Sequence, residues 1–453
     1  MRIHFIAIGG AIMHSLAIAL SRQGHTVTGS DDKIADPART NLKNQGILPD
    51  SEGFYPEKIT ADIDAIILGM HARIDNPELL KAQELGIRID SFPRFIYEVS
   101  KDKKRIVIAG SHGKTTITSM VMHALHHNGI EIDYMVGARV KGFDTGVRLS
   151  TTAPVIVIEG DEYLASPLER ESKFMFYHPH IALITGVAWD HINVFPVYEG
   201  YVDQFRKFAN SVEPRGAITW YEGDAELQQI FATYSGPARA FPYDTSRYEV
   251  RDNKCYVKTD TAEYPMIIFG AHNMQNLEGA RRVCAEMGLT DQQFYTAMGS
   301  FEGAANRLEK LGESMETVVY KDFAHSPSKL KATVNAMKEQ YPQRRLAAVM
   351  ELHTFSSLNK DFLSEYAGAM DRADVAVVFL DDDAMRLKQM PPLDHELVRT
   401  SFGRGDLRIF TSKDELRSYL LSQKWPQSNL LLMTSGQFGG MDVKTLTKEV
   451  LGA

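Results

Sequence analysis

Apolar runs and amphipathic segments alternate along the first hundred residues of the chain. The predicted strands are residues 3–8, 25–32 and 65–70, of which the first and last are almost wholly apolar. The predicted helices are residues 12–24 and 76–86, and each of them ends at a glycine. Strands that alternate with helices in this way favour a parallel sheet covered by helices. We therefore expect a Rossmann-like α/β domain over residues 1–101.

The same alternation begins again at residue 105 and once more after residue 305. In the second series, the predicted strands lie within residues 105–110, 155–163, 181–191 and 217–221. In the third series, they lie within residues 345–352, 374–382, 407–412 and 430–436. Residues 248–259 are typical of a β-hairpin with Asp-Asn at its turn. With a charged linker at residues 100–104, we predict three α/β domains over residues 1–101, 102–305 and 306–453, and the last is also Rossmann-like.

Composition and charge narrow the possible partners. A chain of 453 residues is expected to form about three domains. Its net charge is −8 and it has no long basic run, so nucleic acid is not expected as a partner. The cysteines, Cys255 and Cys284, are too few for a disulfide framework or a four-thiolate zinc site. Since no apolar run approaches about 18 residues, we expect no membrane span and a cytoplasmic location.

A glycine-bracketed turn lies between the apolar residues 105–109 and the next helical segment. It consists of Gly110, Ser111, His112, Gly113, Lys114, Thr115 and Thr116. The turn is shorter than the usual phosphate-binding loop, because Ile108 stands where the first glycine of that motif is expected. An ordinary glycine turn before a helix is the alternative. The motif favours phosphate binding, so we predict a P-loop ATPase-like parallel sheet for the central domain.

The residue types of this turn suit a nucleotide triphosphate. The backbone N–H groups of Ser111, His112 and Gly113 would face the phosphates at the helix N-terminus. The ammonium group of Lys114 would neutralise β- and γ-phosphate oxygens, and the hydroxyl of Thr115 would bind Mg²⁺. ATP and a divalent cation are the ligands that this pattern predicts.

Two other strand ends carry groups that bind cations. Glu159 ends one apolar run, and His191 follows another in the sequence Asp190-His191. If both strands are neighbours of residues 105–110, the carboxylate and the imidazole would meet beside the γ-phosphate. Oxygen and nitrogen ligands with retained water suit Mg²⁺ or Mn²⁺ better than zinc. The structural alternative is a helix cap or salt bridge for Glu159 and a surface position for His191.

Six motifs, in order and over essentially the whole chain, resemble the Mur ligase family. They are GSHGKTT (110–116), EGDEY (159–163), WDHINVF (189–195), GAHNMQNLEGA (270–280), NRLE (306–309) and DFAHSPSKL (322–330). GMHARIDNPELLKA (69–82), EGDEY and MELHTFSSLN (350–359) are most similar to the member that acts in peptidoglycan recycling. The resemblance implies an ATP-dependent amide ligase that joins L-alanyl-γ-D-glutamyl-meso-diaminopimelate to UDP-N-acetylmuramate.

The resemblance also implies the reaction steps and the partners. The lactyl carboxylate of UDP-N-acetylmuramate attacks the γ-phosphorus of ATP and forms an acyl phosphate and ADP. The free amine of the murein tripeptide then attacks the acyl carbon, and phosphate leaves. The implied cofactors are ATP and Mg²⁺, or Mn²⁺ in its place. We expect a monomer or a weak homo-oligomer that acts on these small molecules.

Motif matching assigns further residues to ATP. Those implied on the adenine side are His272, Asn273 and Asn276. Those that the third domain would bring to ATP on closure are Arg307, Asp322 and His325. The implied catalytic residues are Lys114, Glu159, His191, Arg307 and His325. Without the resemblance, the residues favour a polar helix start capped by Asn273, a charged linker at 307–309 and a turn at 325–327.

The turn near the N-terminus is assigned to the diphosphate of the UDP-sugar. The residues that the resemblance implies there are Gly9, Gly10, Ala11, Ser30, Asp31, His71 and Arg73. The spacing from Gly9 to Asp31 is also similar to a dinucleotide fingerprint, but the remaining glycines of that motif are absent. His71 and Arg73 have a plain surface location as their alternative.

The sequence departs from the family pattern at two positions. Gly186 stands where members often carry asparagine, and Ser326 replaces the second histidine of a common His-His-Pro. Neither change removes a charged group, but both affect the placement of metal or water. Lys207 is a remote candidate for the lysine that is carbamylated in some members.

Other functions remain open at this stage. Within the family, a ligase that adds L-alanine to the same UDP-sugar is the alternative, and residues His353, Thr354, Ser356 and Ser357 are our candidates for the choice of amine. A nicotinamide-dependent oxidoreductase would use the first domain and would bind NAD(H). A nucleotide-regulated binding protein would bind ATP without turnover.

Overall fold

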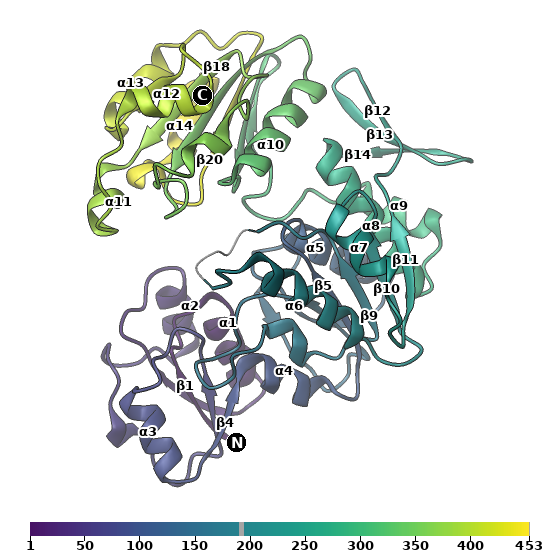
Figure 1. The fold of residues 1–453 in the computed structure, drawn as a ribbon, viewed down its shortest axis with the longest axis vertical. Coiled ribbons are helices and arrows are strands. Elements are labelled where there is room, and N and C mark those ends of the chain that lie inside the picture. The colour runs from purple at the N-terminus through teal and green to yellow at the C-terminus, as the bar shows by residue number, and fades with distance from the viewer. Residues whose placement is uncertain (190–193, 453) are drawn as a thin grey trace. The chain divides into compact units, whose positions relative to one another are not determined.

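The computed structural model describes residues 1–189 and 194–452, and Figure 1 labels its elements. The chain forms two compact units. Unit 1 comprises Met1–Ser246 and Gln275–Met298, and unit 2 comprises Arg247–Met274 and Gly299–Ala453. One helix, α8 (Ala271–Glu286), contributes residues to both units.

The first sheet of unit 1 has four parallel strands in the order β2-β1-β3-β4. The strands are β1 (Arg2–Ile6), β2 (Thr26–Ser30), β3 (Ala65–Leu68) and β4 (Arg88–Ser91). The helices are α1 (Ala11–Arg22), α2 (Ala38–Gln45), α3 (Pro77–Glu84), α4 (Phe92–Ser100) and the 3-10 helix η1 (Pro56–Lys58). Since the strands run in one direction, their carboxyl ends share one edge, where ligands bind in such sheets.

The second sheet of unit 1 has the order β11-β10-β9-β5-β8-β6-β7. Its strands are β5 (Lys104–Ala109), β6 (Ile132–Met135), β7 (Val147–Arg148), β8 (Val155–Glu159), β9 (Ile181–Ile184), β10 (Ala217–Tyr221) and β11 (Arg239–Tyr243). Only β7 is antiparallel among these. The helices are α5 (Lys114–His127), α6 (Tyr198–Asn210), α7 (Ala225–Ala232), α9 (Asp291–Met298) and η2 (Lys173–Phe176). β5 lies between β8 and β9, so the strand ends at Ala109 and Glu159 are neighbours, whereas β9 already ends at Ile184, before the predicted Asp190-His191 end.

Unit 2 contains a small antiparallel sheet and a larger, mostly parallel one. The small sheet is β12 (Tyr248–Arg251), β13 (Lys254–Lys258) and β14 (Glu263–Met266). The larger sheet, in the order β15-β16-β20-β17-β18-β19, is β15 (Glu309–Glu313), β16 (Thr317–Asp322), β20 (Ser428–Met433), β17 (Arg345–Leu352), β18 (Val375–Leu380) and β19 (Arg408–Phe410). Only the edge strand β15 is antiparallel in the larger sheet.

Helices cover the larger sheet of unit 2. They are α10 (Pro327–Gln340), α11 (Asp382–Leu387), α12 (His395–Phe402), α13 (Lys413–Ser422), α14 (Val443–Leu451), η3 (Leu363–Tyr366) and η4 (Phe438–Gly440). Leu416, Leu420, Leu446 and Val450 of α13 and α14 pack on the apolar strands of this sheet in one core. Burial of these aliphatic faces is the main source of stability for the layered arrangement.

The predicted α/β class and its strands are confirmed. All of the strands predicted in the three series are present, and the predicted hairpin turns at Asp252 and Asn253, whose φ angles are +51° and +58°. Asn76 is the N-cap residue of helix α3, and its side chain accepts the N–H groups of Glu78 and Leu79. The sequence pattern did not identify seven further strands, most of which are short or only partly apolar: β4, β6, β7, β11, β14, β15 and β16.

The domain boundaries at 101/102 and 305/306 stay a prediction, since the compact units group the chain differently. Residues 247–274 of the predicted central domain belong to unit 2, whereas residues 275–298 belong to unit 1. Among the described residues, no helix combines the length and the apolar character needed to cross a bilayer.

Candidate active site

A phosphate loop (residues 110–113) joins the end of β5 to helix α5. Gly113 is the N-cap residue and has a φ angle of +73°, and the helix begins at Lys114. The first backbone N–H groups of a helix have no acceptor within the helix. They point away from its N-terminus, where the helix dipole also favours negative charge. This end of α5 is therefore suited to a phosphate group, as the sequence predicted.

Other groups approach the backbone of the phosphate loop closely. A Cβ atom at Gly113 would lie 2.3 Å from Oδ1 of Asn276, and a Cβ atom at Gly110 would lie 2.0 Å from Oγ1 of Thr185. The hydroxyl of Thr185 also donates a hydrogen bond to the carbonyl oxygen of His112. Asn276 and Thr185 therefore leave no room for a side chain at Gly113 and Gly110, and Thr185 also anchors the loop by a hydrogen bond.

The Gly113→Ala substitution is expected to lower ATP-dependent turnover by about 100-fold, because a displacement of about 1 Å in a positioned group has an effect of this size. Gly129→Ala is the matched control. Gly129 follows the other end of α5 with a φ angle of +75°, but no atom lies within 4 Å of the place that a Cβ atom would take there. It should lose only about 1 kcal/mol of unfolding free energy. Steady-state ADP release and chemical denaturation measure the two effects, and equal turnover losses would contradict the steric explanation.

The backbone N–H group of Ser111 has an acceptor within the protein, so its predicted contact with phosphate stays a prediction. The N–H group of Ser111 donates to the carbonyl oxygen of Gly186 at 3.0 Å. The hydroxyl of Ser111 also donates to Gly186 and accepts the N–H group of Ala188 at 2.5 Å. Ser111 therefore ties the phosphate loop to the segment after β9. Gly186, which stands where family members often carry asparagine, therefore contacts the phosphate loop through its backbone carbonyl oxygen.

Lys114 lies in a strongly acidic setting. Its Nζ donates to Oε2 of Glu162 at 2.8 Å and to the carbonyl oxygen of Gly110 at 2.5 Å. The side chain of Glu162 is fully buried, and that of Lys114 is 15% exposed. Burial lowers the pKa of Lys114, but the carboxylates of Glu162, Asp161 and Glu159 outweigh it and raise the pKa above its ordinary value. The ammonium group thus stays charged, and its partner is an anion that a phosphate can replace.

Glu159 connects the phosphate loop with a second loop. Its Oε1 accepts the hydroxyl of Thr115 at 2.6 Å, and its Oε2 accepts the N–H group of Gly137 at 2.7 Å. A hydroxyl and a carboxylate are the hard oxygen ligands that Mg²⁺ prefers. The pair Thr115 and Glu159 therefore fits the predicted cation beside the phosphates. Thr116, the next residue of α5, is buried.

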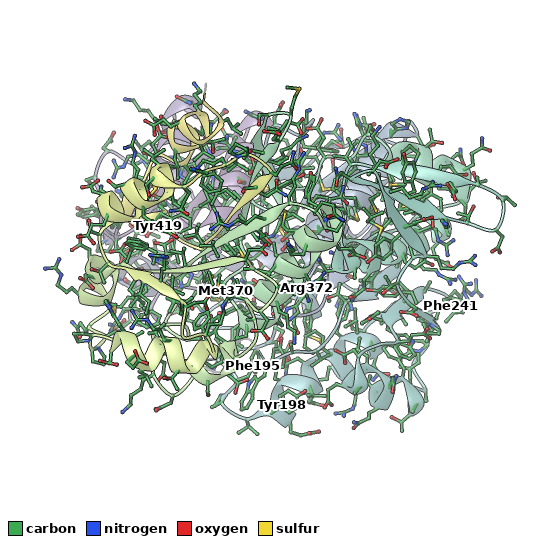
Figure 2. All side chains as sticks on the ribbon, turned by 90° about the horizontal axis from the view of Figure 1, so that it is seen from above. Phe195, Tyr198, Phe241, Met370, Arg372 and Tyr419 are labelled. Atoms are coloured by element: carbon green, nitrogen blue, oxygen red, sulfur yellow. The ribbon has the colours of Figure 1, made fainter. Side chains whose placement is uncertain are left out.

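His191, the third predicted ligand of the cation, lies outside the described residues. The chain on both sides of residues 190–193 is held by aromatic side chains. Trp189 Nε1 donates to the carbonyl oxygen of Phe195 at 2.9 Å, and its ring packs on Tyr198 with centroids 5.4 Å apart. Figure 2 labels Phe195 and Tyr198. The N–H group of Ala188 donates to the hydroxyl of Ser111, so the segment that precedes residue 190 lies against the phosphate loop. The role of His191 stays a prediction.

Of the three residues assigned to the adenine side of ATP, unit 1 contains Asn276. Its side chain lies against the phosphate loop at Gly113. His272 and Asn273 belong to unit 2, where the amide of Asn273 donates to the carbonyl oxygen of Phe269 at 2.9 Å. Burial lowers the pKa of His272, although the carboxylates of Asp322 and Glu339 act in the opposite direction. Contact of these side chains with ATP stays a prediction.

The predicted closure residues of unit 2 surround one turn after β16. Oδ1 of Asp322 accepts the N–H groups of Leu308 (3.2 Å) and Phe323 (2.7 Å). The guanidinium group of Arg307 lies 4.5 Å from the centroid of the Phe323 ring. His325 Nδ1 is 3.0 Å from the carbonyl oxygen of Phe323. Asp322 thus builds the turn that presents Arg307 and His325, and their approach to ATP stays a prediction.

The assigned diphosphate turn lies at the carboxyl edge of the first sheet. Gly9 and Gly10 precede α1, which begins at Ala11, and Gly10 is its N-cap residue. Asp31 follows β2 and its Oδ2 accepts the N–H group of Gly9 at 2.7 Å. Ser30 is fully buried, and Nζ of Lys58 donates to its hydroxyl at 3.4 Å. The structure therefore brings the five predicted residues together at the carboxyl edge of the first sheet: Gly9, Gly10, Ala11, Ser30 and Asp31.

His71 and Arg73 follow β3 at the same edge of the sheet, and both are exposed. Arg73 forms an ion pair with Asp75 at 2.8 Å, with the two side chains 82% and 61% exposed. An ion pair this exposed contributes little to stability, so the arginine is free to change partners. Sugar or diphosphate contacts of these two residues stay a prediction.

Asp31→Asn is expected to change how stability depends on pH. Burial and the neighbouring Asp32 raise the pKa of Asp31 to about 6, against the hydrogen bond from Gly9. A folded-state pKa above the unfolded value means that the folded chain binds more protons between about pH 4 and 6, so stability falls as the pH rises through this window. Above pH 6 the variant should gain about 1–3 kcal/mol of unfolding free energy. Denaturation at several pH values measures the slope, and Asp50→Asn, which changes an exposed carboxylate, should keep it.

The candidates for amine selection fall into two groups. Thr354 and Ser357 bond to each other, with the hydroxyl of Thr354 3.0 Å from that of Ser357 and the N–H group of Thr354 2.9 Å from the same atom. Ser357 is fully buried, so the prediction that these hydroxyls serve a substrate carboxylate is not supported. Ser356 is exposed and His353 is partly exposed at the end of β17.

Lys207, the remote candidate for the carbamylated lysine, lies on α6 and pairs with Asp203 at 2.9 Å, with 58% of its side chain exposed.

Several residues of the site were not predicted from the sequence. Glu162, the partner of Lys114, stands in the motif EGDEY, where three carboxylates in four residues were the available signal. Lys173 pairs with Asp161 of the same motif at 2.6 Å. Thr185 contacts the phosphate loop, and Gly137 contacts Glu159. Both contacts join residues that lie far apart in the sequence, so no local pattern identifies them.

Comparisons with known proteins decide the family. Residues 2–104 match the model of the Mur ligase family, catalytic domain, residues 108–284 match the Mur ligase middle domain, and residues 306–436 match the Mur ligase, glutamate ligase domain. The chain belongs to the Mur ligase family. Mur ligases are ATP-dependent enzymes that form amide bonds, so this chain is an ATP-dependent amide ligase.

Two curated relatives cover nearly the whole chain. The UDP-N-acetylmuramate–L-alanyl-γ-D-glutamyl-meso-2,6-diaminoheptandioate ligase of Escherichia coli is 28% identical over 98% of both chains. The UDP-N-acetylmuramate–L-alanine ligase of Carboxydothermus hydrogenoformans is 28% identical over 99% of this chain and 97% of its own. The murein peptide ligase of Psychrobacter arcticus has the same fold, with a TM-score of 0.68, 23% identity and coverage of 100% and 99%. The predicted Mur ligase resemblance is thus confirmed.

Proposed function

We propose that this Mur ligase joins L-alanyl-γ-D-glutamyl-meso-diaminopimelate to UDP-N-acetylmuramate in peptidoglycan recycling. The observation that carries the proposal is the similarity to the E. coli ligase named for this tripeptide, which extends over 98% of both chains. The phosphate loop, Lys114 and Glu159 supply the groups that ATP-dependent activation of a carboxylate requires. The same proposal places the enzyme in the cytoplasm, as a monomer or weak homo-oligomer.

The proposed reaction has two steps. The lactyl carboxylate of UDP-N-acetylmuramate attacks the γ-phosphorus, ADP leaves and an acyl phosphate forms. The tripeptide amine attacks the acyl carbon, loses its proton, and phosphate leaves with the former acid oxygen. Phosphorylation converts a poor acyl donor into a good one, which splits one difficult step into two.

The residues of unit 1 have separate tasks in the first step. Lys114 leaves Glu162 and places its charge on phosphate oxygens, where negative charge increases in the transition state. The N–H groups at the start of α5 hold the same phosphates, and Asn276 keeps Gly113 in position. Thr115 and Glu159 would hold Mg²⁺, which screens the repulsion between the triphosphate and the attacking carboxylate.

The second candidate function is the addition of L-alanine to the same UDP-sugar. It is favoured by the C. hydrogenoformans relative, which is as similar to this chain as the tripeptide ligase is. Both reactions share ATP and the acid substrate, so the sites of unit 1 do not distinguish them. The difference must lie in the residues that receive the amine.

A two-amine assay tests the proposal. ADP release is measured with UDP-N-acetylmuramate and Mg²⁺-ATP, with either the tripeptide or L-alanine as the amine. A higher kcat/KM for the tripeptide is expected, and the product mass should equal both substrates minus water. A clear preference for L-alanine overturns the proposal in favour of the second candidate. ATP binding without turnover with either amine would overturn both.

A further inference from the structure

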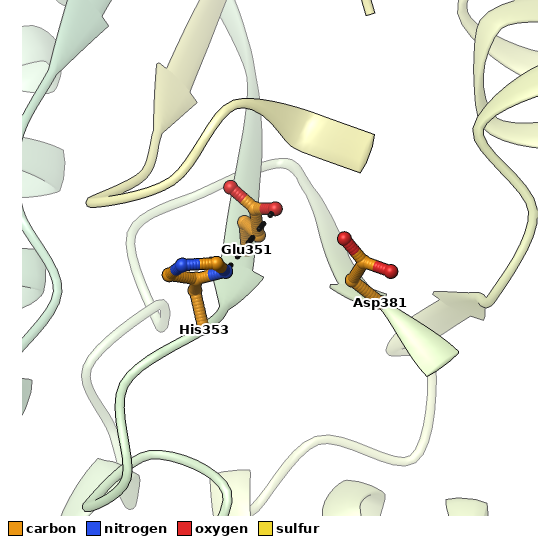
Figure 3. Close-up of side chains that lie close together, drawn as sticks. All are labelled: Glu351, His353 and Asp381. Atoms are coloured by element: carbon orange, nitrogen blue, oxygen red, sulfur yellow. Dashed lines mark ion pairs between the residues drawn. The ribbon is translucent and has the colours of Figure 1, made fainter. Parts of the chain in front are cut away.

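Three potential metal ligands lie at the carboxyl edge of the larger sheet of unit 2. Strands β17 and β18 are parallel neighbours, with Leu352 opposite Leu380. Glu351 is the penultimate residue of β17, His353 follows that strand, and Asp381 follows β18. Figure 3 shows the three side chains gathered at this edge. Their potential ligand atoms all lie within 4.8 Å of one another.

The carboxylate of Glu351 has one satisfied oxygen and one that lacks a donor. Its side chain is fully buried. Oε2 accepts the hydroxyl of Thr434 and, at 3.0 Å, the N–H group of Phe438. Oε1 has no hydrogen-bond partner among the described residues, and it faces Nδ1 of His353 at 3.9 Å. Nδ1 of His353 is buried and likewise lacks a hydrogen-bond partner in the described part of the chain.

Two such atoms facing each other call for a positive charge between them. A buried polar atom without a partner is unfavourable by about 1–3 kcal/mol, and more if it is charged. The separation of 3.9 Å is too long for a hydrogen bond. It is within the span of about 4.2 Å that two ligands can have when each lies about 2.1 Å from one metal ion. The arrangement is therefore better suited to a metal ion than to a shared proton.

The backbone around the pair is also shaped to enclose it. A Cβ atom at Gly436 would lie 2.8 Å from Oε2 of Glu351 and 2.9 Å from Nδ1 of His353. The turn after β20 therefore passes directly over the carboxylate and the imidazole. Asp381, whose Oδ1 accepts the N–H group of Asp383 at 3.0 Å, brings a second carboxylate from the neighbouring strand. Two carboxylates carry a charge that a divalent cation balances.

We propose that Glu351, His353 and Asp381 bind a divalent ion of the first transition series, Zn²⁺ or Mn²⁺. Here three protein groups, one of them an imidazole, replace most of the retained water that favours Mg²⁺, and such a set suits Zn²⁺ or Mn²⁺ better than Ca²⁺ or Mg²⁺. Three protein ligands leave coordination positions open, as in metal sites that bind a substrate. The open positions take an anionic oxygen ligand. That this ligand is a carboxylate of the amine substrate rests on the proposed function.

Metal binding is tested on the full chain without nucleotide. The protein is stripped with a chelator and equilibrated with ZnCl₂ or MnCl₂, and bound metal is measured by mass spectrometry. One ion per chain is expected to remain in the Glu159→Ala variant, which removes the cation ligand of unit 1. Substitution with Co²⁺ should give the visible absorption of a nitrogen- and oxygen-bound ion. Absence of saturable binding in the Glu159→Ala protein overturns the proposal.

Variants locate the ion. His353→Ala and Asp381→Asn should each weaken binding by about 100-fold or more, since even groups behind the ligands change metal affinity by about 10–100-fold. His395→Ala, at the exposed start of α12, is the matched control and should bind normally. Circular dichroism checks that the variants are folded, and neither substitution removes the fully buried Glu351. Binding that survives in both variants identifies an adventitious ion and overturns the proposal.

The proposed contact between the ion and the amine substrate is tested by a separate kinetic measurement. With Mg²⁺-ATP saturating, removal of the unit 2 ion should raise the KM for the amine and leave the KM for ATP unchanged. If the ion binds but L-alanine is the preferred amine, the proposed function fails and the metal site stands. If the tripeptide reacts equally well in the chelated protein and in His353→Ala, the ion does not hold the amine substrate, whereas the proposed function stands.

Discussion

Lys114→Ala is expected to lower the kcat of ATP-dependent ligation by about 100-fold or more, because removing one preorganised group that stabilises developing charge has an effect of this size. Lys114 is the only residue of the phosphate loop and first turn of α5 that carries a permanent positive charge. Its pKa is raised by the surrounding carboxylates, so it stays protonated over the working pH range. Single-turnover ADP formation with saturating ATP measures the loss.

The buried partner of Lys114 requires a second variant. Without the lysine, Glu162 is a buried carboxylate that has lost its ion pair, and such a loss is destabilising by about 3–5 kcal/mol. The Lys114→Ala/Glu162→Gln double variant removes that buried charge, so it should unfold at nearly the temperature of the wild type and still lack turnover. Lys81→Ala, which breaks an exposed pair with Glu84 on α3, is the control. Recovery of turnover in the double variant would show that Lys114 acts on stability alone.

Glu159→Gln is expected to shift the Mg²⁺ dependence of turnover to higher concentration and to lower kcat by about 100-fold. Glutamine retains an oxygen that accepts from Thr115 or Gly137, so the connection between the two loops is preserved. It removes the negative charge that Mg²⁺ requires. The loss should therefore appear in the metal titration and not in the melting temperature.

The measurement is ADP release over a series of Mg²⁺ concentrations at fixed ATP. Glu98→Gln, on the exposed side of α4 beside Lys101, provides a matched loss of one carboxylate. It should leave the titration unchanged. A Glu159→Gln protein with the wild-type Mg²⁺ midpoint would refute a role for this carboxylate in holding the cation.

The glycine turn of residues 110–113 was recognisable as a phosphate-binding motif because the residues of the motif are consecutive in the sequence. A buried strand, two glycines, a lysine and a threonine before a helix place N–H groups, an ammonium group and a hydroxyl together without help from the rest of the chain. The same local logic located Glu159 at the end of β8. The local pattern did not show that the N–H group of Ser111 donates to the carbonyl oxygen of Gly186, because that acceptor lies 75 residues further along the chain.

The residues that complete the site were beyond local pattern. Thr185 and Asn276 determine why Gly110 and Gly113 are glycines, yet each lies far along the chain from the loop that it contacts. Glu162 was visible as part of an acidic motif, but its pairing with Lys114 depends on the adjacency of β5 and β8. Sheet order is set by the packing of whole strands, so a sequence motif cannot report it alone.

The amine end of the reaction shows the same division. Residues 350–359, which include His353, were selected by resemblance. Only the pairing of β17 with β18 and the burial of Glu351 brought a metal-binding arrangement into view. The sequence did not show that the hydroxyls of Thr354 and Ser357 form hydrogen bonds within a local turn.

By itself, the sequence determined the α/β class, the strands of the three series, the glycine turn between a strand and a helix and the resemblance to the Mur ligase family. Alternation of apolar and polar residues and short glycine motifs are local properties, and they carry this information directly. The tertiary structure alone decided which carboxylate meets Lys114, which side chains press on the loop glycines and which ligands gather around Glu351. Those contacts join segments far apart in the chain, and burial removes the water that would otherwise satisfy their charges.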